Sequence, residues 1–368
     1  MPPAFSRPNW AAIDRAALRH NARALAHHAA PARLIAVVKA GAYGHGALEV
    51  ARALESVESV TMLGVASVDE AQILRAGGIQ TEILLLSALL PAEASAAVEL
   101  DVAVTVGDVE LARALNQAAS RRRKRAKTHF KVDTGMSRLG ANWCEAARVF
   151  REVQALESLE IAGIYTHFAS ADEDDDFTAT QLRRFHEFCA EIGPGNRVLK
   201  HAANSAGALR FPAAHFDLVR PGIALYGAHP CPKLGPNLDL QPVMTWRARI
   251  SALKSIAQGQ SVSYGATWTA PRASRIAVVP AGYADGYSRA LSNRGEVLIH
   301  GEKCSVVGRV TMDQILVDVT AINAQIGDEV TLWGQGLPVE EVAERAGTIS
   351  YELLCGVSAR VPRVYLNP

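Results

Sequence analysis

The sequence predicts an α/β fold in two parts, an N-terminal (β/α)8 TIM barrel followed by a C-terminal mostly-β domain. Three observations lead to this prediction. The chain has 368 residues, which is long for a single core and favours two domains. As far as Gly227, short apolar runs alternate with amphipathic, alanine-rich stretches. Beyond that residue the chain changes to short apolar runs separated by glycines and polar turns.

Eight apolar runs are the predicted strands of the barrel. They lie at residues 34–40, 62–67, 82–86, 102–106, 128–134, 161–168, 198–202 and 218–222. Helical patterns separate them, for example at 47–54, 108–118, 145–156 and 178–192. Eight strand–helix units in roughly 200 residues match a closed barrel. An open doubly wound sheet is the alternative, but no Gly-x-Gly-x-x-Gly turn follows any of these runs.

The second part begins after a stretch rich in proline and glycine at 230–236, which predicts a linker. We therefore assign residues 1–235 to the barrel domain and 236–368 to the β domain, with the option that the extreme N-terminal strand joins the β domain. Predicted strands follow at 249–256, 275–279, 295–300, 304–310, 315–319 and 329–333. One helix is predicted at 339–346, because Pro338 precedes it and Gly347 follows it.

Composition argues against several classes of protein. The formal net charge is +1, which offers no field to attract nucleic acid or a membrane. No run of about 18 apolar residues could span a membrane, and the N-terminus lacks the pattern of a signal peptide. The five cysteines are scattered without a Cys-x-x-Cys pair, so neither disulfides nor zinc are predicted, and a cytoplasmic location is expected. The charge runs 121–125 (RRRKR) and 172–176 (DEDDD) are interpreted as solvated loops, and no metal site is predicted.

Lys39 is the first candidate for chemistry, because it closes the apolar run at 34–40. Lysine is rarely buried, and a lone lysine at a strand end more often turns outward at the rim. Two arguments nevertheless favour a functional role. Barrel enzymes place their chemistry at the carboxyl ends of the strands. A partly desolvated lysine also has a lowered pKa, which Schiff-base chemistry requires.

The loops after the seventh and eighth predicted strands are candidates for a phosphate site, because barrels of this kind bind phosphate there. Ser205, Gly222 and Ile223 lie in these loops. Gly222 lets the backbone come close, and its N–H can point at phosphate oxygens. The structural alternatives are a helix cap for Ser205 and a simple turn after Pro221 for Gly222.

The segment around Lys39, AVVKAGAYGHG, resembles the cofactor-lysine motif of the alanine racemases. Further segments resemble blocks of that family, in the family's order and across both predicted domains: HFKVDTGMSRLG from 129, HAANSAG from 201, LVRPGIALYG from 218, VSYGATW from 262, PAGYADGY from 280, GRVTMDQ from 308 and ISYELL from 349. Two positions depart from the family pattern. Gly41 stands where the family usually has Asn, and Thr311 where it commonly has Cys.

The resemblance implies an enzyme that uses pyridoxal 5'-phosphate (PLP), carried by Lys39 as a Schiff base. It implies cofactor contacts for a set of residues from the barrel and from the end of the chain: Tyr43, His167, Ser205, Arg220, Gly222, Ile223 and Tyr351. It also implies that Arg138 bonds the cofactor phenolate oxygen and the substrate carboxylate, and that the Met312 backbone meets the same carboxylate. Tyr264 stands at the place of the family's catalytic tyrosine.

Four further residues receive supporting roles. By resemblance, Lys131 is carbamylated and buttresses Arg138, and Tyr283 lines the mouth of the pocket. We expect His201 to bond Tyr264 and bias its ionisation. We interpret Asp313 as orienting groups near the active site of the other subunit.

Arg220 would ordinarily be a surface salt-bridge residue. The resemblance places it against the pyridine nitrogen of PLP, where most PLP enzymes have a carboxylate. Since an arginine cannot accept a proton, the nitrogen would stay neutral. Carbanion character at the substrate Cα would then be less delocalised, which favours prompt reprotonation over transamination.

The predicted function is racemisation of L- and D-alanine by two bases, Lys39 on one face of the substrate and Tyr264 on the other. The product would supply D-alanine for peptidoglycan, or the enzyme would serve alanine catabolism. The family delivers the tyrosine from a partner chain, so a homodimer is implied. Three alternatives remain: a serine or broad-specificity amino-acid racemase, a PLP-dependent decarboxylase of basic amino acids, and a non-catalytic single-barrel PLP-binding protein. The last needs no second domain, which argues against it.

Overall fold

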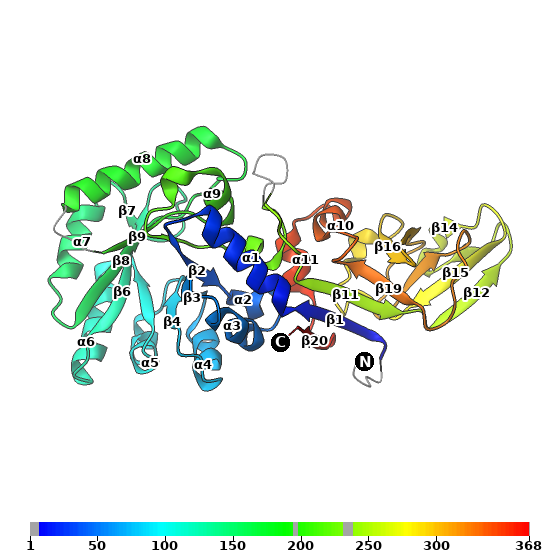
Figure 1. Ribbon diagram of the computed structural model, residues 1–368, viewed down its shortest axis with the longest axis horizontal. Coiled ribbons are helices and arrows are strands. Elements are labelled where there is room, and N and C mark those ends of the chain that lie inside the picture. Colours follow the sequence, from blue (N-terminus) through cyan, green and yellow to red (C-terminus); the bar gives the residue numbers. More distant parts are fainter. Residues whose placement is uncertain (1–6, 194–197, 231–237, 368) are drawn as a thin grey trace.

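The computed structural model describes residues 7–193, 198–230 and 238–367 (Figure 1). The chain forms an α/β barrel and a β-rich domain that lie next to each other along the long axis. The predicted fold class is therefore confirmed. The predicted linker falls almost entirely outside the described residues, so the domain boundary at 235/236 stays a prediction.

Eight parallel strands of the described chain close the barrel, because β5 pairs with β6 and β10 pairs with β2. Each corresponds to a predicted strand: β2 (Arg33–Val37), β3 (Val60–Val65), β4 (Glu82–Leu85), β5 (Ala103–Val106), β6 (Ala126–Asp133), β8 (Leu159–Tyr165), β9 (Leu199–His201) and β10 (Leu218–Val219). The two-residue strand β7 (Ala141–Asn142) pairs alongside β6. β2 and β10 end before Lys39 and Arg220, which therefore lie just beyond the strand ends.

Helices cover the outside of the barrel (Figure 1). They are α1 (Arg15–His28), α3 (Ala47–Glu55), α4 (Val68–Ala76), α5 (Ala94–Glu99), α6 (Val109–Arg121), α7 (Ala146–Gln154), α8 (Asp175–Ile192) and α9 (Ser205–Arg210). Side-chain oxygens that accept backbone N–H groups begin five of them, from Asp14, Ser67, Asp108, Asp174 and Asn204. These caps set where each helix starts after its strand.

The acidic run at 172–176 is exposed, as predicted for a solvated loop, but its last two residues begin a helix, so the prediction of a loop is wrong for Asp175 and Asp176. Asp174 caps α8 by accepting the N–H of Phe177, and Asp175 and Asp176 lie in the first turn. Carboxylates at this position face the positive end of the helix dipole and stabilise it. In the described residues no group of His, Cys, Asp or Glu side chains is arranged to hold a metal ion.

The barrel interior begins with an apolar layer and gains polar side chains towards the carboxyl ends of some of its strands. Ile35, Met62, Leu84, Ala103 and Leu218 form one buried cluster. Two residues further along a strand the side chain faces the same way. At this next level β5 carries Thr105, β9 carries His201 and β10 leads to Arg220, and all three are buried. The barrel therefore has an apolar floor, above which β5, β9 and the residue after β10 contribute buried polar side chains.

The β domain consists of a six-stranded sheet in the order β17-β16-β19-β11-β1-β20, a three-stranded sheet β12-β15-β18 and a hairpin β13-β14. Their bounds are β1 (Asn9–Asp14), β11 (Met244–Arg249), β12 (Ala252–Ile256), β13 (Ser261–Val262), β14 (Trp268–Thr269), β15 (Ser274–Val279), β16 (Glu296–Ile299), β17 (Glu302–Ser305), β18 (Ile315–Asp318), β19 (Glu329–Trp333) and β20 (Arg363–Leu366). β1 pairs with β11 and β20, so the N-terminal strand joins this sheet and then leads into α1 of the barrel (Figure 1).

Two helices end the chain before β20. α10 (Val339–Ala346) spans the predicted residues and stops at Gly347, whose φ of 72° is left-handed. α11 (Ser350–Gly356) follows it and was not predicted. None of the described helices is long and apolar enough to cross a bilayer.

Candidate active site

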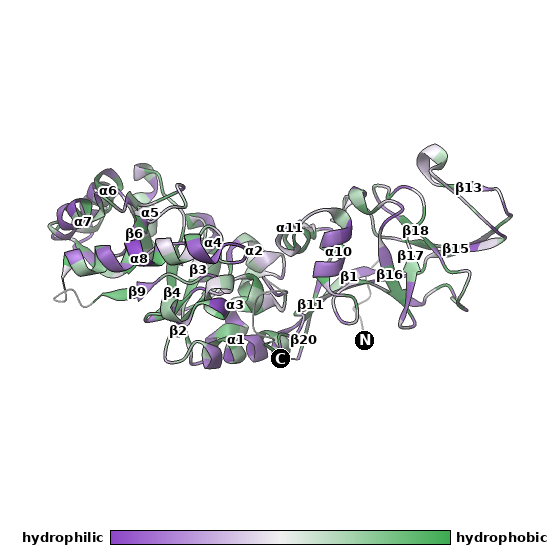
Figure 2. Ribbon diagram, turned by 90° about the horizontal axis from the view of Figure 1, so that it is seen from above, coloured by the Kyte–Doolittle hydropathy of each residue, from purple (hydrophilic) through white to green (hydrophobic). Residues whose placement is uncertain are grey.

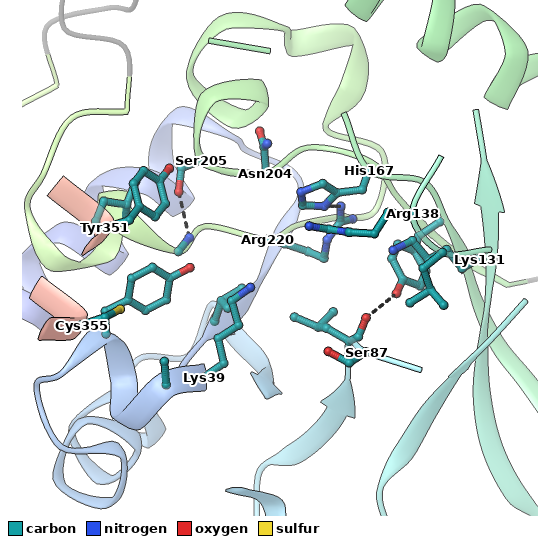
Figure 3. A pocket seen from close by; sticks show the side chains of 18 of the residues that line it. Lys39, Ser87, Lys131, Arg138, His167, Asn204, Ser205, Arg220, Tyr351 and Cys355 are labelled. Atoms are coloured by element: carbon teal, nitrogen blue, oxygen red, sulfur yellow. Dashed lines mark hydrogen bonds between the residues drawn. The ribbon is translucent and has the colours of Figure 1, made fainter. Parts of the chain in front are cut away.

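A cavity of about 550 Å³ opens at the carboxyl ends of the barrel strands (Figure 3). Its lining includes ten of the predicted site residues: Lys39, Tyr43, Lys131, Arg138, His167, Ser205, Arg220, Gly222, Ile223 and Tyr351. Tyr351 comes from α11, and the others come from the barrel. The remaining five predicted site residues lie elsewhere: His201 below the cavity, and Tyr264, Tyr283, Met312 and Asp313 on the β domain.

Lys39 is the first residue of α2 (Lys39–Tyr43), and the residues that follow it form an unusual left-handed turn. The four residues Ala40, Gly41, Ala42 and Tyr43 have φ values of 53°, 61°, 55° and 53°. Each residue with a Cβ loses about 1–2 kcal/mol in this conformation. Glycine adopts it without that cost and Asn tolerates it better than most residues, which explains why Gly41 can replace the family's Asn. A Cβ at Gly41 would meet nothing within 4 Å.

The pKa of Lys39 lies below the ordinary lysine value. Burial in the cavity is the main cause, and the guanidinium of Arg138 adds to it. The carboxylate of Glu70 acts in the opposite direction. In this setting the lysine is a neutral amine for a larger fraction of the time than an exposed lysine, and a neutral amine can attack a carbonyl or accept a proton.

One end of the cavity is built from hydroxyl groups and close backbone. The Ser205 hydroxyl accepts the N–H of Gly222 at 2.8 Å. Our expectation that the Gly222 N–H points at phosphate stays a prediction, since this donor bonds Ser205 in the structure, and the Ser205 O–H can itself be presented to a ligand. A Cβ on Gly222 would lie 2.4 Å from the Tyr43 hydroxyl, so only glycine leaves room for that group. The Tyr43 and Tyr351 rings lie 6.1 Å apart at the same end.

Arg220 is a fully buried cation whose partners are all uncharged. Its guanidinium donates to the carbonyls of Thr166 and Ala202 at 2.8 Å, to His201 Nδ1 at 2.8 Å and to His167 Nδ1 at 3.2 Å. Burial lowers the pKa of Arg220 to about 10, so it keeps its charge at neutral pH. The cavity therefore has a fixed positive donor with no carboxylate bonded to it among the described residues.

His201 supports Arg220, and our expectation that it bonds Tyr264 is wrong. Its side chain is fully buried, with Nδ1 bonded to Arg220 and Nε2 bonded to His129 Nδ1 at 2.8 Å. With both ring nitrogens occupied and no exposed surface, the ring cannot meet a tyrosine of this chain or of another. Burial, followed by the charge of Arg220, holds the pKa of His201 well below its ordinary value.

Lys131 is buried beside two guanidinium groups. Burial is the largest effect on its pKa, followed by the charges of Arg220 and Arg138, and together they lower it to about 7. The ammonium also lies 5.3 Å from the centre of the Tyr165 ring. Because a protonated Lys131 and Arg138 carry the same charge, the bare side chain of Lys131 cannot buttress the arginine by charge.

The four predicted residues of the β domain are exposed. Tyr264 is 73% exposed, Met312 53% and Tyr283 44%, which is unusual for side chains of this size. Their loops are tied together, since the Ser263 hydroxyl donates to the Arg309 carbonyl at 2.7 Å and the Tyr283 N–H to the Thr311 carbonyl at 3.0 Å. Asp313 accepts from Arg360 at 2.6 Å beside them.

This exposed group lies away from the cavity of its own chain. Tyr264 begins η4 (Tyr264–Ala266), between the strands β13 and β14. β13 lies at the end of the β domain that is remote from the barrel (Figure 2). A single chain therefore brings together the predicted cofactor pocket but not the predicted second base.

Comparison with known proteins identifies the family of this chain. Two family models, "Alanine racemase, N-terminal domain" and "Alanine racemase, C-terminal domain", match residues 13–230 and 243–365. Curated relatives named alanine racemase include one from Symbiobacterium thermophilum, 45% identical and covering 98% of this chain and 97% of that protein. Another, from Desulforamulus reducens, is 46% identical over 99% of this chain and 100% of that protein. The chain belongs to the alanine racemase family.

Solved alanine racemase structures share the whole fold. The enzyme from the D-cycloserine producer Streptomyces lavendulae superposes with a TM-score of 0.93 at 38% identity, covering 99% of this chain and 98% of that chain. The alanine racemase from Bacillus anthracis gives 0.90 at 35% identity, covering 99% and 96%. The resemblance found in the sequence and the prediction of an isomerase of this family are confirmed. Because both domain models match, the single-barrel alternative does not apply.

Nine residues that line the alanine racemase cavity were not predicted as site residues, among them Ser87, Asn204 and Cys355. Cys355 follows Tyr351 by four residues on α11, a spacing that places both on one helix face. That spacing is a signal that could have found it, had α11 been predicted. Asn204 caps α9 and Ser87 follows β4, and neither residue type carries a signal by itself at such positions.

Proposed function

We propose that this protein interconverts L- and D-alanine with PLP bound to Lys39. The observation that carries the proposal is the content of one cavity: a lysine of lowered pKa, a buried uncompensated arginine and a hydroxyl-lined end where only glycine fits. The donor set fits PLP. Lys39 would bind its aldehyde carbon, Arg220 would face its ring nitrogen, and Ser205 with Tyr43 and Tyr351 would hold its phosphate.

When bound, PLP supplies an electron sink that makes the Cα–H bond of an amino acid acidic. The side chains of this chain would then do the rest. Arg138, which is exposed at the cavity, would bind the substrate carboxylate as a charge-assisted pair. Arg220 donates but cannot accept a proton, so the ring nitrogen beside it would stay neutral. This favours return of a proton to Cα over transamination.

Racemisation needs a proton acceptor on each face of the substrate. Lys39 is the acceptor on one face, and its lowered pKa suits it to that work. The second acceptor is Tyr264, but from a second copy of the chain. Its 73% exposure on the far part of the β domain supports a homodimer in which each β domain completes the partner's cavity.

Mixing two inactive variants tests the shared site. Lys39→Ala and Tyr264→Ala are purified separately, then dissociated and reassociated together with PLP. If each cavity combines Lys39 of one chain with Tyr264 of the other, about a quarter of the wild-type activity returns, because half of the dimers are mixed and each holds one intact site. The matched control mixes Lys39→Ala with Arg138→Ala, whose mixed dimers hold no intact site. No recovery in the first mixture, or equal recovery in both, would contradict the proposal.

Substrate identity is tested by a chiral amino-acid assay of the purified protein with added PLP. Turnover of alanine with little turnover of D-serine, and no release of carbon dioxide from lysine or arginine, is the expected result. Faster turnover of serine would make the protein a serine racemase, and carbon dioxide release would make it a decarboxylase. Service in D-alanine supply for peptidoglycan, in the cytoplasm, is the role we propose for the product.

A further inference from the structure

We propose that Glu70 is a positioning residue that fixes Lys39 over the cavity by holding the backbone of the residue next to it. Glu70 lies on α4, outside the cavity lining, and none of the sequence motifs includes it. The inference rests on the proposed role of Lys39. It extends that role to a residue that touches neither substrate nor cofactor.

The carboxylate of Glu70 joins two loops of the barrel. Its Oε1 accepts the N–H of Ala40 at 2.6 Å, and its Oε2 accepts the N–H of Ala66 at 2.7 Å. Ala40 follows Lys39 after β2, and Ala66 follows β3. Hydrogen bonds from N–H groups to a carboxylate are shorter and about twice as strong as bonds between neutral groups. One side chain therefore clamps the two neighbouring strand ends together.

The position of Glu70 is itself fixed. The Ser67 hydroxyl caps α4 and accepts the N–H of Glu70 at 3.2 Å. The Glu70 side chain then turns back to Ala66, the residue before the cap. In this reciprocal arrangement one carboxylate oxygen of Glu70 bonds Ala66, and the other is available to accept the N–H of Ala40.

The clamp acts where the backbone needs it most. The left-handed turn begins at Ala40, and its first N–H has no acceptor inside the turn, as at the start of any helix. Ala40 and Ala42 carry a Cβ in this left-handed conformation, which is unfavourable for residues other than glycine. The N–H of Ala40 belongs to the peptide group that joins Lys39 to Ala40. A shift of this turn would therefore move the Lys39 Cα and, with it, the amine.

Electrostatics support the same assignment. The charges of Arg138 and Arg220 lower the pKa of Lys39, whereas those of Glu70 and Cys355 raise it. Glu70 therefore partly offsets the two guanidinium groups that share the cavity with the lysine.

Glu93 provides a matched control. Its carboxylate makes the same kind of contact one loop further on, where Oε2 accepts the N–H of Leu90 at 2.8 Å at the start of η1 (Pro91–Glu93). Both carboxylates are half-buried and both follow a barrel strand. In the described residues Glu93 bonds only within its own loop, so it shares the chemistry of Glu70 without the link to Lys39.

The test compares Glu70→Gln with Glu93→Gln in the full-length protein. Glutamine keeps the size of the side chain but offers one acceptor oxygen instead of two, so it cannot bond both N–H groups and the clamp between the two loops is broken. We expect amide hydrogen exchange in the peptide covering residues 38–46 to rise at least about tenfold in Glu70→Gln and to be unchanged in Glu93→Gln. The rate at which Lys39 takes up PLP, trapped by borohydride reduction and located by mass spectrometry, should fall with it. For racemisation, kcat should fall by about 10- to 100-fold, with KM for alanine within about threefold.

Two further variants separate positioning from stability. Ser67→Ala removes the cap of the same helix but keeps the carboxylate, so it should lower the melting temperature while leaving exchange at 38–46 and Lys39 reactivity unchanged. Glu70→Asp, whose shorter side chain cannot reach both N–H groups, serves if the glutamine variant does not fold, with the same expected results. Exchange and Lys39 reactivity in Glu70→Gln or Glu70→Asp that match Glu93→Gln would overturn the proposal. Because these two readouts need no turnover, they still decide the role of Glu70 if the wild-type protein fails to racemise alanine.

Discussion

Depletion of carbon dioxide should destabilise this protein through a single side chain, Lys131. With a pKa of about 7, roughly half of the Lys131 amines are neutral at pH 7, compared with fewer than about one in a thousand for an ordinary lysine at 10.5. Neutral amines react with carbon dioxide to give carbamates. A carbamate is anionic and would hold Arg138 by charge-assisted hydrogen bonds, as the family resemblance implies. We therefore expect Lys131 to be carbamylated when bicarbonate is present.

The size of the effect follows from the pKa shift. In the folded protein the bare amine has a pKa below that of the unfolded chain, so it binds protons less readily when folded. That difference destabilises the fold at every pH below about 10.5, most strongly near pH 7 and below. At pH 8 the penalty is about 3 kcal/mol, since each pKa unit corresponds to about 1.4 kcal/mol. Carbamylation removes it, so removal of bicarbonate should cost up to this amount, and the cost should shrink as the pH rises from 8 towards 10.

Thermal unfolding with and without bicarbonate measures the effect, and carbon-13 NMR after addition of labelled bicarbonate locates the carbamate. The matched control is Lys127 on the same strand, which is 50% exposed and paired with Glu82. Lys127→Met should keep the response to bicarbonate, whereas Lys131→Met should abolish both the response and the carbamate signal. Equal melting temperatures with and without bicarbonate, or a carbamate signal that survives Lys131→Met, would refute this reasoning.

Two further predictions concern the cavity and the second base. Gly41→Asn should retain activity and stability, whereas Gly41→Val should lose at least about 1–2 kcal/mol of unfolding free energy. The reason is that the φ of 61° is the only constraint at this position, where a Cβ would meet nothing within 4 Å. Equal thermal stability of the two variants would show that the left-handed turn is not strained. Tyr264→Phe should nearly abolish exchange of the L-alanine Cα proton with solvent deuterium while exchange on D-alanine stays measurable, because Lys39 remains; NMR in deuterated buffer follows both, and similar residual exchange on the two enantiomers would exclude the two-base scheme.

The barrel strands could be predicted from sequence because each one is buried on both faces and therefore reads as a continuous apolar run. The sheet of the β domain could be predicted only in part. β1 has the short sequence NWAAID, and its partners β11 and β20 lie far along the chain, at 244–249 and 363–366. The sequence offered its membership of the β domain only as an option, because no local pattern reports a pairing of that sequence separation.

For the site, positions after the strand ends pointed to Lys39 and Ser205, and the family resemblance pointed to Arg220, but their local geometry did not follow from the sequence. The single glycine in KAGAY does not predict that four consecutive residues adopt the left-handed conformation. The partners of His201 depend on which strands face each other across the barrel, and alternation along one strand cannot supply that. Glu70 was missed because helix-cap signals are common, whereas the contact of its second oxygen with Ala40 is a tertiary feature.

The hydrogen bonds around Arg220 explain how a buried guanidinium can stay charged and still be available to the pyridine ring of PLP. Arginine only donates, so His201 Nδ1 must accept from it, and His201 Nε2–H must therefore donate to His129 Nδ1. Each imidazole is thus fixed in one neutral tautomer, which agrees with the pKa of about 3 that burial and the Arg220 charge give His129. A carboxylate bonded to Arg220 would neutralise its charge. The neutral imidazoles of His167 and His201 and two backbone carbonyls instead orient the guanidinium without reducing its charge. The pyridine nitrogen of PLP in front of it would therefore meet a permanent donor and no acid. If that orientation is what the histidines provide, His201→Phe should leave the barrel folded but shift the absorbance of bound PLP, a readout that simple loss of packing would not change.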